Sequence, residues 1–425
     1  MSVREPARET PVLTRSDVLV VGGGTAGVAA AVAAARAGAE VTLVERYGSL
    51  GGLATGGLIA LLLSMDDGAG RQVIGGLCQE TIDRLERANG CFYPPREHWG
   101  LDAAELVEEY FRWGLVWGGS RASHRVRYSV AYDPEVMRQV LNELVTEAGV
   151  DLIFHMWGAD ALVEGDRVRG VAFQSKAGRC AILADVTIDA TGDGDIFASA
   201  GCAFELERVH PWLWFRLGGV EVSDEILGRT SGFFRTPNAG QVLLPWGSAA
   251  RIDRKIDATD PRDLTHAELE CRRMVMEEVE RVRETIPGAA EAHICNIASQ
   301  LGITESRRVV GRHVLGRDEM GRDFDDAIAI TGHWTKYGAV YAIPYRCLQT
   351  REYANLLAAG RNISVDHRVH HATKEIPCCM AVGEAAGLAA RLSLDKAADV
   401  TAVDTPRLRT ELTNAGALLD YFTSG

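Results

Sequence analysis

The chain has 425 residues, 47% of them hydrophobic and 24% charged, and a net charge of −13. This is the composition of an ordinary globular protein, long enough for two domains, and its acidic balance argues against nucleic acid as a partner. Its apolar runs are too short for a membrane span, which needs about 18 residues, and its nine cysteines form no CxxC, which argues against a dithiol pair, an iron–sulfur cluster or a zinc knuckle.

The first residues and the cysteines also indicate where the protein works. Residues 1–13 are polar and carry charges of both signs, so we expect a flexible arm and no signal peptide there. An odd number of scattered cysteines is typical of reduced thiols, and we therefore expect a cytoplasmic protein. The sequence leaves open whether the chain forms a homo-oligomer.

The first predicted unit is a strand, a helix and a second strand around a glycine-rich turn, in residues 16–45. In the GxGxxG turn, Gly22 allows the tight bend, Gly24 lets the backbone approach a pyrophosphate, and Gly27 lets the helix pack closely on the sheet. The helix N-terminus offers unpaired N–H groups to the phosphates. Glu45, after the second strand, is placed to accept hydrogen bonds from ribose hydroxyls. The unit therefore predicts a bound dinucleotide.

More glycines and three helical patterns follow this unit. Five glycines in residues 48–57 bring the backbone close to something flat or charged. Apolar residues at helical spacing predict helices at 75–90 and 102–117. A third helix is predicted between an N-cap at Asp133 and a stop at Gly149.

The rest of the chain leaves the pattern of apolar strands and small-residue helices and later returns to it. Residues 151–195 alternate β-rich runs with turns, and the last of these turns is a second place where backbone can pass near a dinucleotide. Aromatic and charged residues become denser from about 205 to 340, and a long charged helix is predicted at 265–285. The first pattern returns with a strand that ends at Gly360 and a small-residue helix that opens at Gly383.

In this order, the segments resemble the flavoproteins of the glutathione-reductase-like superfamily. GITESRRVVGRHVL, residues 302–315, is similar to a segment of the bacterial FAD-dependent oxidoreductase family marked by a GIRESRR-like motif. The resemblance covers residues 16–393. Three further segments agree with that family: FDDAIA at 324–329, IPYRCL at 343–348 and NLLAAGRNIS at 355–364.

The resemblance implies an α/β fold in which a Rossmann-like, glutathione-reductase-like FAD-binding domain carries an inserted α+β cap domain for the substrate. FAD is the implied cofactor, and the implied reaction is the oxidation or desaturation of a small organic substrate by hydride transfer to the flavin N5. The electron acceptor stays open. The implied boundaries are 14–60, 125–205 and 341–395 for the FAD-binding domain, 61–124 and 206–340 for the cap, and 396–425 for a C-terminal tail.

The resemblance also implies where FAD is held. The glycine loop after Glu45 would face the isoalloxazine or the pyrophosphate, and Asp195 would lie by the pyrophosphate or ribitol. The helix N-terminus at Gly383 would face the pyrimidine edge of the flavin, where it would stabilise the negative charge of the reduced ring. The residues expected to bind FAD are Gly22, Gly24, Thr25, Ala26, Gly27, Glu45, Arg46, Gly51, Gly52, Thr55, Gly57, Thr191, Gly192, Asp195, Gly360, Arg361, Gly383 and Gly387.

Several residues on the substrate side depart from the family pattern. Thr304 stands in place of an arginine of the motif, so an anion site cannot be carried over unchanged. In the later segment 364–380, Lys374 stands where an arginine is common. Three more departures lie just before the predicted flavin-facing helix, where small or apolar residues are more usual: Asp366, His370 and His371.

The histidines of this segment predict acid–base chemistry. Because histidine titrates near pH 6.5, His367 or His371 is suited to take a proton from the substrate as the hydride leaves. With Arg308, these two are the predicted catalytic residues. The predicted substrate contacts are His333, Tyr337, His370 and Lys374.

Other roles remain open for the same residues. Arg307 and Arg308 could instead form ion pairs with carboxylates such as Glu305. Trp212 and Trp214 could wall an apolar substrate or pack in the core. Three histidines spaced i, i+3 and i+4 could meet on a helix face and hold a metal, although we expect none.

Two other functions fit the same motifs. The chain could be an electron-transferring flavin subunit of a larger redox complex, with iron–sulfur clusters supplied by a partner. It could also resemble thiazole-forming proteins, which use a related fold to remodel a bound NAD. The lack of iron–sulfur cysteine motifs weighs against the first of these, and a pure binding module is least expected because a large cap predicts a closed reaction chamber. Oxidation of a small organic substrate remains the leading hypothesis.

Overall fold

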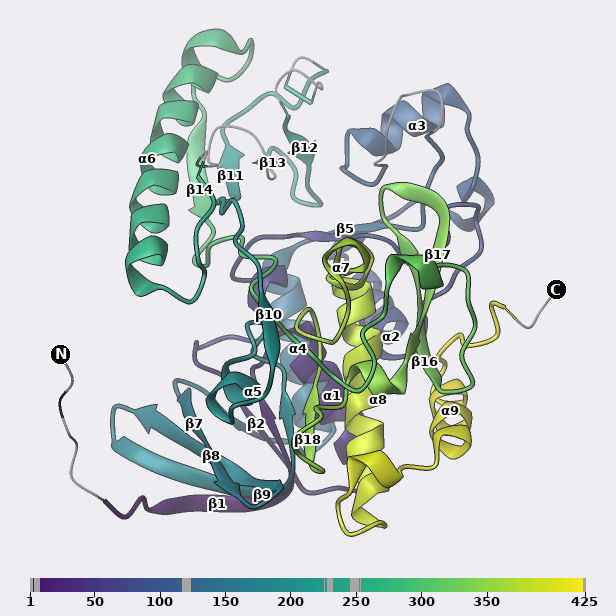
Figure 1. Ribbon diagram of the computed structural model, residues 1–425. Coiled ribbons are helices and arrows are strands. Elements are labelled where there is room, and N and C mark those ends of the chain that lie inside the picture. The colour runs from purple at the N-terminus through teal and green to yellow at the C-terminus, as the bar shows by residue number, and fades with distance from the viewer. Residues whose placement is uncertain are drawn as a thin grey trace.

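The computed structural model describes residues 3, 8–116, 124–224, 226–227, 232–244, 252 and 254–422. Its largest sheet, in the lower part of Figure 1, is built around parallel strands. β1 (Val12–Val21) lies between β2 (Val41–Val44) and β9 (Gly178–Asp189), and β6 (Asp151–Ile153) pairs with β2. Every residue of β2 is buried, as expected for a parallel strand covered on both faces. The strand–helix–strand unit predicted from residues 16–45 is confirmed.

β9 is the strand at which this sheet branches. Its C-terminal half pairs in parallel with β18 (Leu356–Ala358), and its N-terminal half pairs antiparallel with β8 (Arg167–Ser175). β7 (Trp157–Glu164) then pairs antiparallel with β8. The last residues of β1, β2, β9 and β18 lie in one register, so their carboxyl ends form a single edge. Ligands of open α/β sheets bind at such an edge.

α1 (Thr25–Arg36) and α8 (Ile376–Leu394) form a close helix pair beside this sheet (Figure 1). A Cβ added at Gly383 would stand 2.2 Å from the carbonyl oxygen of Ala26, and one added at Gly387 would stand 2.0 Å from that of Ala30. Both contacts advance by one helical turn in the same sense, so the two helices run in parallel. Their N-termini therefore lie at the same end of the pair.

The prediction that the last small-residue helix opens at Gly383 is wrong. α8 begins at Ile376, with Pro377 in its first turn, where the missing N–H of proline costs no helical hydrogen bond. Gly383 and Gly387 lie in the interior of α8, where they allow close contact with the backbone of α1. The helix end that could face a flavin is therefore the one at Ile376.

The remaining helices largely follow the sequence pattern. α4 (Pro134–Glu147) has the predicted cap, because the Asp133 carboxylate accepts a hydrogen bond from the Glu135 N–H. The helix expected at 102–117 appears as α3, and residue 117 lies outside the described residues. The others are α2 (Gly76–Arg87), α3 (Ala104–Phe111), α5 (Asp195–Ser199), α7 (His367–Thr373) and α9 (Thr405–Asn414).

A second sheet, in the upper left of Figure 1, lies away from the parallel strands and belongs to residues 215–297. Its antiparallel order is β12-β13-β11-β14, and α6 begins at Pro261, four residues before the predicted start at 265. Arg272 and Arg283 of α6 donate hydrogen bonds to the carbonyls on either side of β14. The bounds are β11 (Phe215–Gly218), β12 (Phe234–Arg235), β13 (Val242–Leu244), β14 (His293–Ile297) and α6 (Pro261–Thr285).

Short strands join these parts of the molecule. β10 pairs with β15, β16 and β17 form a hairpin, and β5 lies between β3 and β4. Their bounds are β3 (Leu61–Leu62), β4 (Cys91–Phe92), β5 (Val130–Tyr132), β10 (Phe204–Leu206), β15 (Arg307–Val309), β16 (Ala327–His333) and β17 (Lys336–Pro344).

The division into an FAD-binding domain and a cap stays a prediction. Within the range 61–124 that was expected in the cap, α2 packs against α4 and α8. None of the helices formed by the described residues is long and apolar enough to cross a bilayer.

Candidate functional site

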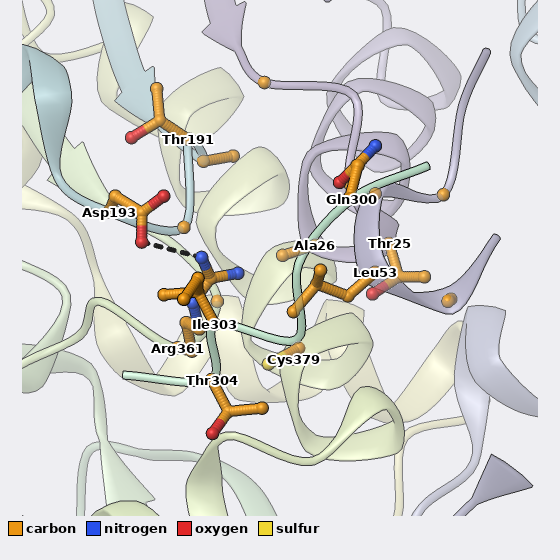
Figure 2. Close-up of a pocket in the computed structure, with 18 of the residues that line it drawn as sticks. Thr25, Ala26, Leu53, Thr191, Asp193, Gln300, Ile303, Thr304, Arg361 and Cys379 are labelled. Atoms are coloured by element: carbon orange, nitrogen blue, oxygen red, sulfur yellow. Dashed lines mark hydrogen bonds and ion pairs between the residues drawn. The ribbon is translucent and has the colours of Figure 1, made fainter. Parts of the chain in front are cut away.

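A cavity of about 500 Å³ lies at the common edge formed by the carboxyl ends of β1, β2, β9 and β18. The loop after each of these strands contributes to its wall: residues 22–26, 45–47, 190–195 and 359–361. The start of α8 and residues 300–304 also contribute to it, as do Gly51, Gly52, Trp157, Trp212, Trp214, Arg307 and Trp334. Figure 2 shows Arg361 and Asp193 in the cavity, with Thr25 and Leu53 on the opposite side of the view.

The glycine turn after β1 is shaped to receive a large group. Gly22 has a φ of +105°, and a Cβ there would stand 2.4 Å from the Ala190 carbonyl oxygen. A Cβ on Gly27 would stand 1.8 Å from the Gly22 oxygen, so this glycine serves close packing. A Cβ on Gly24, by contrast, would meet no atom within 4 Å. Gly24 is the N-cap of α1, and no cap side chain covers the N–H groups of the first turn, so an anion can approach this end of the helix.

Glu45 closes one end of the cavity. Its carboxylate is 5% exposed and accepts hydrogen bonds from the N–H groups of Gly23 at 2.6 Å and Tyr47 at 2.8 Å. Burial raises the pKa of Glu45, against the opposing effect of these hydrogen bonds. The guanidinium of Arg46 lies 4.8 Å from the ring centre of Trp157, which also lines the cavity. This end therefore offers a carboxylate and a flat cationic surface.

The second glycine loop lies against the first one. Gly51 has a φ of +102° and donates a hydrogen bond to the Gly23 carbonyl at 2.8 Å, which brings Gly51 and Gly52 onto the wall. Thr55, predicted to face the cofactor, is fully buried, and its hydroxyl donates to the Leu50 carbonyl at 2.6 Å. Gly57 packs against Leu53. Thr55 and Gly57 therefore shape the loop from beneath.

The turn after β9 is held by a carboxylate network. Asp193 pairs with Arg361 at 2.7 Å and accepts a hydrogen bond from the Ser306 hydroxyl at 2.6 Å. Burial alone would raise the pKa of Asp193, but the charge of Arg361 and the Ser306 hydrogen bond lower it. Arg307 pairs with Asp195 at 3.0 Å. The predicted Thr191, Gly192, Asp195, Gly360 and Arg361 all line the cavity.

The two arginines of the ESRR segment point in different directions, because side chains alternate along β15. Arg307 lines the cavity. Arg308 is buried, pairs with Glu305 and with Glu205, and donates to the Val365 carbonyl at 3.1 Å. Both arginines therefore form ion pairs, as the alternative expected, but only Arg307 lies on the cavity wall. Sequence reasoning missed Arg307 and Asp193 as cavity groups, and Ser306 as the hydroxyl that holds Asp193. The alternation of side chains along the strand was the available signal for Arg307.

The three histidines gather around Glu305. His367 begins α7 and lies 3.0 Å from Glu305, and buried His370 lies 3.5 Å from the same carboxylate. Burial lowers the pKa of His370 to about 4. Burial alone would raise the pKa of Glu305, but His370, His367 and Arg308 lower it to about 2. His371 is exposed, with its ring 5.5 Å from that of His367.

The cavity walls, as far as the structure describes them, include none of these three histidines. Nor do they include His333 or Tyr337 of the β16–β17 hairpin. His333 is buried, and burial lowers its pKa to about 4. The group of described side chains best placed to hold a metal is Glu207, Glu305 and His367, and not the three histidines together.

Another part of the cavity wall is aromatic. Trp212, Trp214 and Trp334 line it together with the residues at the start of α8. Lys374, a predicted substrate contact, is on this wall and donates a hydrogen bond to the Thr304 hydroxyl at 3.3 Å. Trp212 thus lies on the cavity wall, which is one of the two positions that the sequence allowed for it.

The residues present suit a bound dinucleotide. The cavity offers uncapped amides at the α1 N-terminus, open space in front of Gly24 where a side chain would otherwise stand, and a carboxylate at Glu45. A pyrophosphate, a ribose and a flat ring system require these three features.

Comparison with known proteins agrees with this fit. The model of a family described as FAD dependent oxidoreductase matches residues 17–412. No curated protein sequence matches the chain significantly. CabE, an aromatic hydroxylase from angucycline biosynthesis, is similar in structure, with a TM-score of 0.50 and 14% identity over 94% of this chain and 68% of CabE.

Two further solved structures have TM-scores of 0.49 and 14% identity. One is a geranylgeranyl bacteriochlorophyll reductase-like protein from Thermoplasma acidophilum, with 94% of this chain and 83% of that chain covered. The other is p-nitrophenol 4-monooxygenase PnpA from Pseudomonas putida DLL-E4, with 97% and 90% covered. At such identities a structural likeness concerns the fold alone. The family match over almost the whole length is decisive: the chain belongs to the FAD-dependent oxidoreductase family, and FAD is its cofactor.

Proposed function

We propose that this enzyme oxidises or desaturates a small organic substrate by hydride transfer to N5 of FAD. The observation that carries the proposal is that one cavity is lined both by the dinucleotide-type loops at Gly24 and Glu45 and by the aromatic residues Trp212 and Trp334. Cofactor and substrate would therefore share a single chamber. When bound, FAD supplies the chemistry of accepting a hydride, and with it two electrons.

Different residues along this chamber would hold the cofactor and exclude water. The N–H groups at the start of α1 would hold the pyrophosphate, and Glu45 would accept hydrogen bonds from the adenosine ribose. Trp212, Leu301 and Ile303 line the wall and would exclude water from the reacting carbon, which strengthens every charge interaction there. We further propose that the β11–β14 sheet with α6 is the cap, and that the ESRR segment marks the GIRESRR-like branch of the family.

The proton acceptor predicted at His367 or His371 stays a prediction. His367 is engaged by Glu305, and neither ring is on the described cavity wall. A proton leaving the substrate would need a relay to reach either one. A double replacement of the two histidines that leaves the rate of flavin reduction unchanged would remove them as the base.

An absorbance spectrum before and after acid precipitation tests the cofactor state first. Flavin bands that leave with the supernatant indicate non-covalent FAD, and bands that stay in the pellet indicate a covalent flavin. Anaerobic addition of amines, alcohols and acids should then bleach the flavin with one class and give a product lacking two hydrogens. If dithionite reduces the flavin but none of these substrates does, while a partner protein does, the electron-transferring alternative is favoured. Absence of flavin even after reconstitution would favour NAD remodelling.

Gly24→Val tests where the dinucleotide lies. Its backbone has a φ of −63°, which valine adopts readily, and no atom stands within 4 Å of the position of a Cβ. We expect the apoprotein to unfold at the same urea concentration as the wild type, within about 0.5 kcal/mol, and to bind no FAD. A variant that binds FAD normally would place the cofactor elsewhere.

A further inference from the structure

Glu375 is the unpaired carboxylate of the cavity. Five carboxylates line the cavity in the part of the chain that the structure describes. Glu45 accepts two backbone N–H groups, and Asp193, Asp195 and Glu268 each pair with an arginine. The Glu375 side chain has no hydrogen-bond or ion-pair partner among the described residues, and it makes no side-chain cap at the start of α8.

Glu375 lies on the cavity wall, at the start of α8. Its neighbour Lys374 donates a hydrogen bond to the hydroxyl of Thr304. Two residues before Thr304, Gly302 packs so closely on Trp212 that a Cβ would stand 2.3 Å from the indole nitrogen. Lys374 is thus engaged by Thr304, and no ion pair between it and Glu375 is found in the described residues. Glu375 thus lines the same cavity as Trp212, Trp214 and Trp334.

A carboxylate in such surroundings calls for a positive partner. Glu375 is half-buried. A ligand that fills the cavity would remove its carboxylate further from water, which is costly unless the group takes up a proton or meets a cation. Burial raises the pKa of Glu375 to about 7, against the opposing charge of Lys374, so near neutral pH the group is poised between these two states. Indole rings attract organic cations through their faces and also bury apolar carbon.

We propose, on the basis of the function proposed above, that the substrate class is a primary or secondary amine with an apolar body, whose ammonium group is bound by Glu375 between the tryptophans. The carboxylate takes one proton from the ammonium and leaves a neutral amine. The C–H bond next to nitrogen then breaks, its electron pair leaves as a hydride to FAD, and the nitrogen lone pair forms a C=N bond. The product is an iminium ion, which water hydrolyses to a carbonyl compound and an amine or ammonia.

Ligand binding tests the recognition step without turnover. The oxidised holoenzyme is titrated anaerobically at neutral pH with N,N,N-trimethylbenzylammonium, which has no N–H to lose, and with its neutral isostere neopentylbenzene, by calorimetry. We expect the cation to bind about tenfold more weakly to Glu375→Gln than to the wild type, with binding largely restored in Glu375→Asp. The neutral isostere should bind equally to all three. Equal cation binding to the wild type and Glu375→Gln would overturn the assignment.

Flavin reduction tests the chemistry and separates it from the proposed function. Benzylamine and hexylamine are compared with benzyl alcohol and hexanol in anaerobic stopped-flow mixing. We expect the amines to bleach the flavin, with a rate constant about 100-fold lower in Glu375→Gln. The matched control is Glu284→Gln, an exposed residue of α6, and it should keep the wild-type rate.

The possible failures are distinguishable. Bleaching by the alcohols and not by the amines would overturn the amine inference and leave the proposed function standing. Bleaching by amines at the same rate in Glu375→Gln would overturn the role of Glu375. If the cation binds in a Glu375-dependent way but neither class bleaches the flavin, the amine site stands as a binding site, and its oxidation by this enzyme is overturned.

Discussion

Replacing Gly387 by alanine tests whether backbone contact between α1 and α8 holds the edge of the cavity. The new Cβ would stand 2.0 Å from the Ala30 oxygen, where real Cβ atoms essentially never come closer than 3.0 Å, so the helices must part by about 1 Å. In an exposed helix the same change would raise the stability of the protein by about 1 kcal/mol, because alanine favours the helix more than glycine does. Overpacking costs about 1–3 kcal/mol, and the upper value applies because the opposing atoms are backbone and cannot rotate away. The expected net loss of stability is about 2 kcal/mol.

Two measurements check this expectation. Urea unfolding of the apoprotein gives the change in stability, and fluorescence titration with FAD gives the change in affinity. Since the N-termini of both helices line the cavity, their separation should weaken FAD binding about tenfold. The control is Arg391→Ala on the same helix, which loses a partly exposed ion pair with Asp395 and should cost less than about 1 kcal/mol. A Gly387→Ala protein more stable than the wild type would refute the packing argument.

Three further predictions concern charged groups. Glu45→Ala leaves two backbone N–H groups without their acceptor and should weaken FAD binding at least about tenfold. An unchanged affinity in the fluorescence titration with FAD would show that FAD binding does not depend on the Glu45 carboxylate. Arg308→Ala should lower the free energy of unfolding in urea by about 3–5 kcal/mol, because it leaves buried Glu305 short of a partner. Arg307→Ala should mainly lower the affinity for FAD. Equal losses of stability in the two variants would contradict the opposite orientations of the two side chains. Stability should fall as the pH drops from 6.5 to about 4, because the unfolded chain protonates His370 there and the folded one resists. It should fall again from 4.5 to about 2, as the ionised Glu305 that the fold favours is lost. A urea midpoint that is flat from pH 6.5 to 4 would contradict the first step.

The sequence predicted the strand–helix–strand unit and its glycine turn well, for a physical reason. A strand that feeds a GxGxxG turn, a small-residue helix and a terminal acid satisfies several constraints of dinucleotide binding at once, and Gly22, Gly24 and Glu45 all lie on the cavity. The start of α8 was misjudged because a glycine at a helix entrance and a glycine at a helix crossing look the same in sequence. Pro377 was the better indicator of the entrance.

The substrate half could not be predicted in the same way. Which of Arg307 and Arg308 faces the cavity depends on the phase of a three-residue strand. The histidines were predicted as proton acceptors because of their pKa range. The sequence could not show that the face of α7 that carries His370 turns toward Glu305 and the Arg361 carbonyl. Glu375 belongs to no motif. A role for it could be proposed only once the structure showed that its side chain has no partner among the described residues and that it lines the same cavity as three tryptophans.

The parallel contact between α1 and α8 also bears on how the enzyme is made. Because the chain is synthesised from its N-terminus, the helix that carries Ala26 is made long before its partner around Gly383. Until then the apolar flank of the first helix has no permanent cover, and the flavin chamber lacks one of its walls. We therefore expect tight FAD binding only after the helix around Gly383 has been synthesised and has packed on the first helix.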